Sequence, residues 1–402
     1  MEQIKEYIGD EKLERTDLAS WKMLDEAIWY NLKCVTMFGS TADGNTVDQM
    51  DQIGFYTGAN EYLYDGATKF TNNLLNVKYN ILRSEDRPLN DMQELISVGE
   101  NTVYENPYHT SIGYLMDSEV FNWIGDNVYP FDVLNEFAYY AYEEEDLFQY
   151  KEVSEPSLHD VTVEKTNDGE YSFENTTAQI DNIVFYINIE EDTEELYIHY
   201  DGSQVENAVI AVGDNEIVSD SLSSRIYPVG KLYGGDRVEV RMQLKDDGTN
   251  SGVVRITAAT LNQEAFDNIT KRMEEEQFKT TSYTSNSITG TVDAPKDCML
   301  FFSIPSDPGW EVTMDGEKVE TTTIGESFLA LDVSEGHHEI EMKYTPPGFV
   351  NGCIISAAAI IVFIMLWIVN KKEIDFLSGK NRKRRYRRKK IGKRGTSVRN
   401  PS

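Results

Sequence analysis

The stretch GFVNGCIISAAAIIVFIMLWIV, residues 348–369, decides how this chain is organised. It contains no charged residue, and from Cys353 onward its one polar side chain is Ser356. An α-helix rises about 1.5 Å per residue, so roughly 20 such residues cross the ~30 Å hydrocarbon layer of a membrane. Its place near the C-terminus excludes a signal peptide. We therefore expect one transmembrane helix over residues 348–370.

The segment after this helix is strongly basic and predicts the topology. Residues 371–402 contain 14 Lys and Arg and two acids, Glu373 and Asp375. Segments rich in Lys and Arg stay on the cytoplasmic side of a membrane. The tail is therefore expected inside the cell, and everything before Gly348 outside the cytoplasm.

Three residues at the inner end of the helix are expected to anchor it. Trp367 stands where an aromatic residue at the membrane surface is expected. Lys371 and Lys372 begin the basic cluster, which attracts anionic lipid headgroups by about 1 kcal/mol per residue near the surface. A polybasic run can also bind nucleic acid, but its position directly after a span favours lipid contact.

The rest of the chain is acidic and has the composition of a folded protein. Removing the tail's net charge of +12 from the total of −32 leaves −44 on residues 1–370. Such a charge disfavours nucleic acid as a partner. The three cysteines exclude a disulfide framework; a bridge between Cys34 and Cys298 stays open beside two unpaired thiols, which we prefer.

The N-terminus complicates this topology. Residues 1–20 lack the apolar run of a signal peptide, and a body outside the cytoplasm cannot cross with a C-terminal span alone. Two interpretations remain: upstream spans encoded elsewhere, or a tail-anchored protein whose body lies inside. The basic tail favours the first, which makes the chain the C-terminal part of a larger protein.

Residues 1–150 predict a mixed α/β domain. Residues 18–32 have loose helical spacing, and residues 128–142 form a helix that begins beside Pro130. Short strands are expected at residues 33–41, 74–82 and 111–116. The acidic run at residues 143–146 is interpreted as a solvated linker rather than a cation site.

Residues 155–262 alternate apolar and polar side chains in several short runs, which predicts a β-sandwich domain. Asp201-Gly202, Gly213-Asp214, Gly234-Gly235 and Asp247-Gly248 are the expected turns between strands. Residues 263–279 then predict an amphipathic connector helix.

Residues 280–346 predict a second, membrane-proximal β domain. Its clearest element is a hairpin whose turn is Asp315-Gly316, since this pair accepts the positive φ angles of a tight turn. His337 and His338 are adjacent and face opposite sides of a strand, so no metal site is expected there. No cofactor is expected anywhere in the chain.

Several segments resemble the YfhO family of bacterial membrane proteins. The most specific are FFSIPSDPGWEVTMDGEKV at residues 301–319 and SFLALDVSEGHHEIEMKYTPPGF at residues 327–349, which resemble the family's C-terminal signature. Further resemblances, in order, are MFGSTADGNTVDQMDQIGFYTG at 37–58, LLNVKYNI at 74–81, ENPYHTSIGYLM at 105–116 and YPFDVLNEF at 129–137.

The resemblance implies a function. The family is similar to GT-C glycosyltransferases, which have many N-terminal spans, a large extracytoplasmic portion and a last span. It implies transfer of sugars from a polyprenyl-phosphate carrier to cell-wall polymers such as lipoteichoic acid. The catalytic acid of that fold lies on an early loop that has no counterpart here, so no catalytic residue is carried over.

Two functions are weighed. The first is the extracytoplasmic module of a membrane glycosyltransferase, with polyprenyl-phosphate sugar and polymer bound through upstream spans. Tyr62, Tyr64, Tyr79, Tyr108 and Trp310 are its candidate glycan contacts, because aromatic faces stack on sugars, although each is more often a core residue. The second is a non-enzymatic, membrane-anchored binding or scaffolding protein of the cell envelope. Motifs of soluble hydrolases are absent from the sequence.

Overall fold

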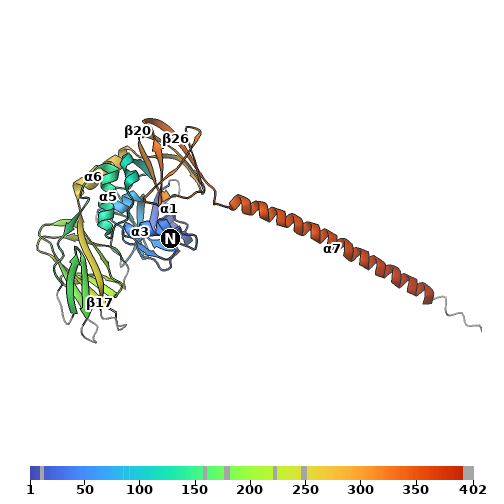
Figure 1. Ribbon diagram of the computed structural model, residues 1–402, viewed down its shortest axis with the longest axis horizontal. Coiled ribbons are helices and arrows are strands. Elements are labelled where there is room, and N and C mark those ends of the chain that lie inside the picture. Colours follow the sequence, from blue (N-terminus) through green and yellow to red (C-terminus); the bar gives the residue numbers. More distant parts are fainter. Residues whose placement is uncertain are drawn as a thin grey trace, which may run out of the picture. The chain divides into compact units, whose positions relative to one another are not determined.

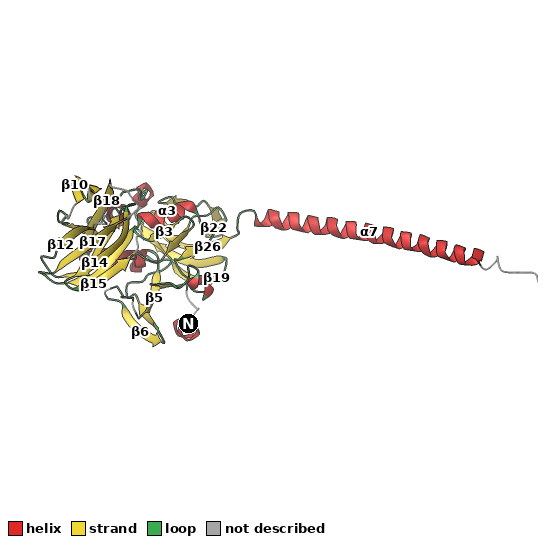
Figure 2. Cartoon of the chain, turned by 90° about the horizontal axis from the view of Figure 1, so that it is seen from below, coloured by secondary structure: helices red, strands yellow, loops and turns green. Residues whose placement is uncertain are grey.

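Strands dominate most of the chain, and one long helix ends it (Figures 1 and 2). The computed structural model describes residues 1–9, 13–84, 86–89, 91–156, 161–175, 182–220, 224–245 and 251–392. It divides into two units, Met1–Lys343, called the body below, and Tyr344–Ser402. The expected fold class, α+β and β-sandwich regions followed by one C-terminal apolar helix, is confirmed.

Two sheets in the middle of the chain form a β-sandwich. One has the order β10-β11-β18-β13-β16 with β9 beside β18, and the other has the order β12-β17-β14-β15. Their strands are β9 (Phe148–Lys151), β10 (Val161–Asn167), β11 (Glu170–Asn175), β12 (Asn182–Asn188), β13 (Thr193–Asp201), β14 (Val205–Val212), β15 (Asn215–Asp220), β16 (Arg225–Leu232), β17 (Arg237–Leu244) and β18 (Ser251–Leu261).

The alternation seen in the sequence produces this sandwich. On β12, Ile183, Phe185 and Ile187 are buried, and the residues between them face outward. They share one core with side chains of the opposite sheet. Gly213 and Gly235 have φ angles of 59° and 100°, as tight turns require. The expected turn Asp247-Gly248 lies outside the described residues.

A second pair of sheets follows the sandwich. A five-stranded sheet has the order β19-β20-β26-β22-β23, and a four-stranded sheet has the order β24-β25-β21-β8. The strands are β19 (Lys279–Thr284), β20 (Ser287–Ala294), β21 (Cys298–Pro305), β22 (Trp310–Met314), β23 (Glu317–Val319), β24 (Thr322–Ile324), β25 (Phe328–Val333) and β26 (Gly336–Tyr344). In both views this pair and the sandwich lie at opposite ends of the body (Figures 1 and 2).

The expected hairpin between β22 and β23 is confirmed. Met314 pairs with Glu317, so Asp315 and Gly316 form the two-residue turn, with φ angles of 54° and 83°. The Asp315 carboxylate also accepts the backbone N–H of Glu339 at 2.8 Å. The turn is therefore tied to β26 as well.

Strand β8 (Gly113–Met116) comes from the first third of the chain but completes the second pair of sheets. It pairs antiparallel with β21, and Met116 lies opposite Met299. Arg15 makes a further link, since its guanidinium donates to the Ser303 carbonyl at 2.6 Å. The N-terminal region and the last β-strands therefore form one structure.

The N-terminal region contains two small sheets, β1-β5-β7-β6 and β2-β4-β3, and several short helices. Besides β8, its elements are α1 (Glu2–Ile8), β1 (Arg15–Leu18), α2 (Glu26–Trp29), β2 (Met37–Phe38), α3 (Gly44–Gln52), β3 (Tyr56–Gly58), β4 (Glu61–Leu63), α4 (Lys69–Leu74), β5 (Val77–Arg83), β6 (Gln93–Val98), β7 (Asn101–Glu105), η1 (Ser118–Asn122) and α5 (Pro130–Tyr142).

The helical interpretation of residues 18–32 is wrong for most of that segment. Leu18 ends strand β1, which pairs in parallel with β5, and only Glu26–Trp29 is helical. Pairing with a strand far along the sequence outweighs a weak local spacing. The helix expected at residues 128–142 is confirmed as α5, with Pro130 at its first turn.

Helix α4 lies at the centre of the body, and every one of its residues is buried. Its backbone is bonded by parts of the chain that are distant in sequence. The Tyr197 hydroxyl of β13 accepts from the Lys69 N–H at 3.2 Å, and the Tyr114 hydroxyl of β8 donates to the Leu74 carbonyl at 2.7 Å. The Asn73 amide donates to Thr270 at 3.0 Å. These bonds join α4 to the sandwich, to β8 and to the helix of residues Gln263–Glu275.

The connector helix is α6 (Gln263–Glu275). Its N-cap Asn262 accepts from the N–H groups of the first turn, and Ala265, Phe266, Ile269 and Met273 are buried along one face. It is shorter than the expected residues 263–279, because Lys279 already begins β19.

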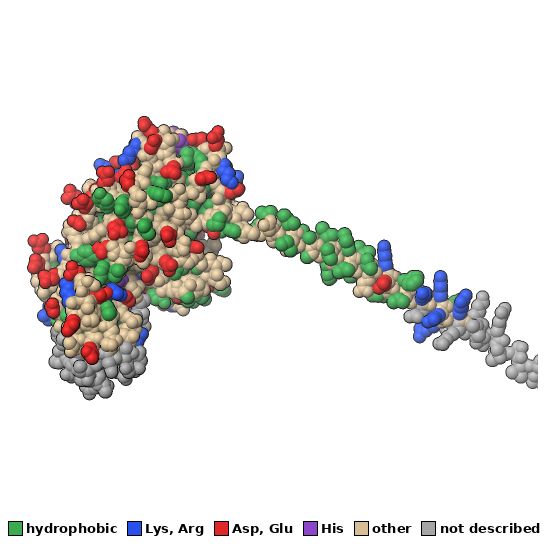
Figure 3. Space-filling view, viewed as in Figure 1, with side chains coloured by type: hydrophobic (Ala, Val, Ile, Leu, Met, Phe, Trp, Pro, Cys, Tyr) green, Lys and Arg blue, Asp and Glu red, His purple; other side chains and the backbone are tan. Residues whose placement is uncertain are grey.

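Helix α7 (Phe349–Gly392) begins directly after Gly348, whose φ is 80°. Apolar side chains cover its first part, and Lys and Arg side chains follow (Figure 3). The residues from Phe349 to Ile374 form a candidate membrane span of 26 residues, long enough to cover roughly 39 Å.

Candidate functional site

The five predicted glycan contacts occupy different places in the body. Tyr62, Tyr64 and Tyr79 are buried, with exposed fractions of 9%, 4% and 9%. Tyr108 and Trp310 are half-buried and pack against core clusters. The structure does not bring the five rings to one cavity.

Two of these residues have clear structural contacts. The Tyr64 hydroxyl donates to the Asn72 side chain at 2.5 Å and accepts from Asn80, all inside the body. The Tyr108 ring meets Phe266 edge-on, with centroids 5.1 Å apart. Such positions are those of side chains that hold elements together.

A different group of tyrosines lines a cavity of about 530 Å³ at the side of the sandwich. This volume is within the range of small-molecule sites. The cavity, called the tyrosine cleft below, is lined by the start of α5, by β9 and the residues after it, by the β10–β11 hairpin and by β18. Its residues include Tyr129, Asp132, Tyr150, Glu152, Glu155, Asp168, Gly169, Tyr171 and Thr257.

Tyr129 and Tyr150 present polar and aromatic groups together. The Tyr150 hydroxyl donates to the Asp132 carboxylate at 2.7 Å, and the Tyr129 hydroxyl donates to the Asp168 carbonyl at 2.7 Å. Burial, followed by nearby carboxylates, raises the pKa of both phenols. Both hydroxyls therefore stay protonated at neutral pH, and the cleft carries carboxylate acceptors beside aromatic faces.

One lining residue of the cleft, Thr257, has a buried hydroxyl without a partner among the described residues. Thr257 is 7% exposed, and its Oγ1 makes no hydrogen bond within the described residues. Gly169 packs closely against this residue: a Cβ there would lie 2.8 Å from Thr257 Cγ2 and 3.3 Å from the Tyr129 hydroxyl. An unpaired buried hydroxyl is costly unless something binds it.

No pattern in the sequence indicates this cleft. Its lining comes from four segments that meet only when α5 and the β10–β11 hairpin pack beside β18. Tyr129 lies in a segment used for the family resemblance, but its spacing does not distinguish it from the other tyrosines of the chain. Residue type alone does not show which side chains point inward.

The described residues hold no group of three or more His, Cys, Asp and Glu side chains suited to a metal ion. His337 and His338 bond to different acids, Asp293 at 2.6 Å and Asp315 at 2.7 Å. Within the acidic run, Glu143, Glu145 and Asp146 are exposed. Cys34 and Cys298 are both free thiols, so the bridge is not formed.

The anchor residues lie on the exposed surface of α7. Trp367 is 57% exposed, and the Lys371 ammonium lies 5.2 Å from its ring centroid. Lys372 follows on the same helix and is exposed. A largely apolar, unburied helix of this length has the character of a membrane-spanning segment.

The family model described as "Bacterial membrane protein YfhO" matches residues 1–356. The chain belongs to the YfhO family. Among curated proteins, "Uncharacterized protein YfhO" of Bacillus subtilis (strain 168) is 24% identical over 111 residues, which cover 28% of this chain and 13% of that protein. The match thus spans about an eighth of the relative's length.

Solved structures show only weak similarity. The GH26-CBM35 β-(1,4)-mannanase of Podospora anserina has a TM-score of 0.20 at 12% identity, covering 28% of each chain. The xylan-binding module CBM86 of Roseburia intestinalis has a TM-score of 0.20 at 14% identity, covering 30% of this chain and 93% of that one. These values are too low to support an argument about this chain.

Membership in the YfhO family agrees with the apolar helix, and this YfhO protein is a membrane protein. The family match includes the β-rich body and ends within α7. Its segment LLNVKYNI, residues 74–81, is buried throughout, from the end of α4 into β5. That part of the resemblance therefore reflects the core of the fold.

Proposed function

We propose that this chain forms the extracytoplasmic portion and C-terminal anchor of a YfhO integral membrane protein that glycosylates cell-surface polymers. The sugar would come from a polyprenyl-phosphate carrier, and lipoteichoic acid is one acceptor of the expected class. Within this function we assign the tyrosine cleft to glycan binding, and we assign no catalytic residue to this chain.

The tyrosine cleft carries the proposal. Aromatic faces pack against the C–H surfaces of sugars, and carboxylates and hydroxyls bond sugar hydroxyl groups. Tyr129 and Tyr150 supply the first kind of group, and Asp132 supplies the second. The neutral phenols suit a polar, uncharged ligand.

The topology rests on the charges of α7. Lys and Arg side chains follow the apolar segment of the helix, and the positive side of a span stays in the cytoplasm. The body would then lie outside, where cell-surface polymers are. The same basic residues support contact with anionic lipid headgroups.

Glycan binding is tested with the full chain in neutral lipid nanodiscs. Methyl glycosides of glucose, galactose and N-acetylglucosamine are titrated and followed by saturation-transfer NMR. We expect at least one to bind, and Tyr150→Ala to weaken binding tenfold or more. Tyr139→Ala removes a comparably exposed ring on α5 outside the cleft and should leave binding unchanged. Equal effects of the two substitutions would contradict the assignment.

The enzymatic and scaffolding alternatives differ in whether the chain takes part in sugar transfer. Given a polyprenyl-phosphate sugar and an acceptor polymer, the chain alone should bind without turnover, because its catalyst is proposed to lie in other spans. Turnover by the isolated chain would place the chemistry here. Binding without stimulation of transfer in membranes containing a full-length YfhO protein would favour a scaffold.

A further inference from the structure

A second cavity adjoins the tyrosine cleft. Its volume is about 500 Å³, which is within the range of small-molecule sites. Tyr150, Lys151 and Glu152 line both cavities. The rest of the second cavity is lined by Ser154 and by the connection between β12 and β13, including Asn188, Glu190, Glu191 and Thr193. We call it the glutamate cavity.

The segment that lines both cavities connects the two sheets of the sandwich. Lys151 pairs with Ala258 of β18, whereas Val153 pairs with Ile187 of β12 in the opposite sheet. Tyr150 is 45% exposed, and Lys151 beside it is exposed as well. The residues that the two cavities share are therefore accessible to a ligand that lies across them.

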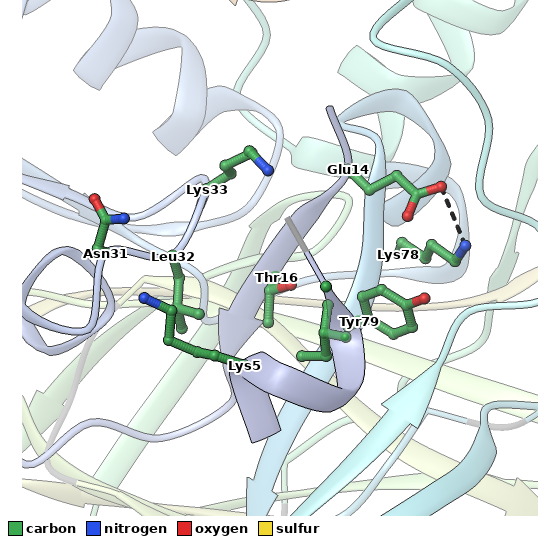
Figure 4. A pocket seen from close by; sticks show the side chains of 10 residues that line it. Lys5, Glu14, Thr16, Asn31, Leu32, Lys33, Lys78 and Tyr79 are labelled. Atoms are coloured by element: carbon green, nitrogen blue, oxygen red, sulfur yellow. Dashed lines mark hydrogen bonds and ion pairs between the residues drawn. The ribbon is translucent and has the colours of Figure 1, made fainter. Parts of the chain in front are cut away.

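The glutamate cavity has hydrogen-bond acceptors that the fold does not use. Within the described residues, the carboxylates of Glu152, Glu190 and Glu191 make no ion pair and no hydrogen bond. A cavity in the N-terminal region differs, because there Glu14 contacts Lys78 at 3.1 Å, as the dashed line in Figure 4 shows. Carboxylates accept hydrogen bonds and sugar hydroxyls donate them, so the glutamate cavity suits a further sugar unit.

We propose that the tyrosine cleft and the glutamate cavity form one groove for an oligosaccharide of two or more units. One unit packs against Tyr129 and Tyr150, and the next lies beside Glu190 and Glu191. A second unit on the same molecule adds contacts without a second loss of translational freedom, so affinity rises with chain length. This inference rests on the proposed glycan binding and specifies its ligand as a chain rather than a single sugar.

The effect of chain length is tested with the full chain in neutral lipid nanodiscs, by titration followed with saturation-transfer NMR. The probes are the three methyl glycosides named above and the disaccharides maltose, cellobiose, β-1,4-galactobiose and diacetylchitobiose. We expect at least one disaccharide to bind tenfold or more tightly than the methyl glycoside of its own sugar. Methyl glycoside binding with no gain for any disaccharide would refute the groove and leave glycan binding in place. Absence of binding by every probe would contradict glycan binding itself and this inference with it.

Substitutions in the glutamate cavity locate the second unit. Glu190→Ala/Glu191→Ala should lower disaccharide affinity to that of the methyl glycoside and leave methyl glycoside binding as in wild type. Glu206→Ala/Glu216→Ala removes two exposed carboxylates on β14 and β15, outside both cavities, and should bind every probe as wild type does. Asn188→Ala repeats the test at another exposed lining residue, should the first variant fail to fold. Unchanged disaccharide affinity in a folded cavity variant would overturn the assignment.

Discussion

At the residue scale, single polar side chains hold distant elements together inside the body. Asp117, after β8, receives bonds from Arg272 of α6 at 3.0 Å and from Lys296, between β20 and β21, at 2.6 Å. Burial alone would raise the pKa of Asp117, but these two cations outweigh it and lower the pKa below its ordinary 3.8. One carboxylate thus links three parts of the chain.

The lowered pKa gives a pH-dependent prediction for Asp117→Asn. Because the unfolded carboxylate takes up a proton more readily than the folded one, its stabilisation is full above about pH 4 and is lost below it. We expect the variant to lose about 1–3 kcal/mol at pH 7. Chemical denaturation of the full chain should show this difference shrinking as the pH falls through the lowered pKa.

A matched control tests whether the loss of stability requires a buried ion pair or follows from removing any ion pair. Asp293 also contacts a lysine and a histidine, Lys279 at 3.0 Å and His337, but its side chain is 59% exposed. Asp293→Asn should destabilise the chain much less than Asp117→Asn, because exposed ion pairs contribute little to stability. Equal losses of stability in the two variants would mean that Asp117 contributes no more than an exposed carboxylate.

At the element scale, β22 shows that the alternation of apolar and polar residues predicts burial only in part. The sequence predicts that Trp310, Val312 and Met314 share an inward face. In the structure Val312 is 1% exposed, while Trp310 and Met314 are half-buried at the margin of the core. Trp310 packs against the cluster that contains Phe302 and Leu331, whereas Phe328 belongs to another core.

This arrangement changes the expected cost of losing the tryptophan. Complete burial would make Trp310→Ala cost about 3–5 kcal/mol. A ring packed on one side only should cost about 1–3 kcal/mol in the full chain. Thermal unfolding of Trp310→Ala, Val312→Ala and Glu311→Ala tests this arrangement. The Trp310 and Val312 variants should have lower melting temperatures than wild type, and Glu311→Ala should not. A Trp310→Ala melting temperature equal to that of wild type would leave Trp310 free for a surface role.

The sequence predicts individual strands and turns better than it predicts which strands pair with each other. The strands of the sandwich and the Asp315-Gly316 turn follow from period and turn chemistry, and the structure contains them. The strand expected at residues 111–116 exists as β8, but nothing local indicates that it pairs with β21. The tyrosine cleft was missed for the same reason, because Tyr129 and Tyr150 meet only through long-range packing.

At the scale of the whole molecule, the low reactivity of the cysteine thiols allows the membrane topology to be measured by cysteine labelling. Burial raises the pKa of Cys34 and raises that of Cys298 to about 11, so neither is a reactive thiolate at neutral pH. Cys353 lies in the candidate span. The native chain should therefore react little with a membrane-impermeant maleimide.

Two introduced cysteines then report the sides of the membrane. Lys318→Cys, at a side chain that is 71% exposed, should be labelled on intact cells or spheroplasts. Lys383→Cys, in the basic part of α7, should be labelled only after the membrane is opened. The reverse pattern would place the body in the cytoplasm and favour a tail-anchored protein.

The pairing of β8 with β21 also determines when the protein can finish folding. Met116 leaves the ribosome long before Met299, and at ~5–20 residues per second the interval is on the order of ten seconds or more. Until then one edge of β8 has no partner from β21, and such late, non-local pairing makes folding slow. The last strand of the body, β26, ends only a few residues before α7 begins, so the body closes at almost the moment its anchor emerges.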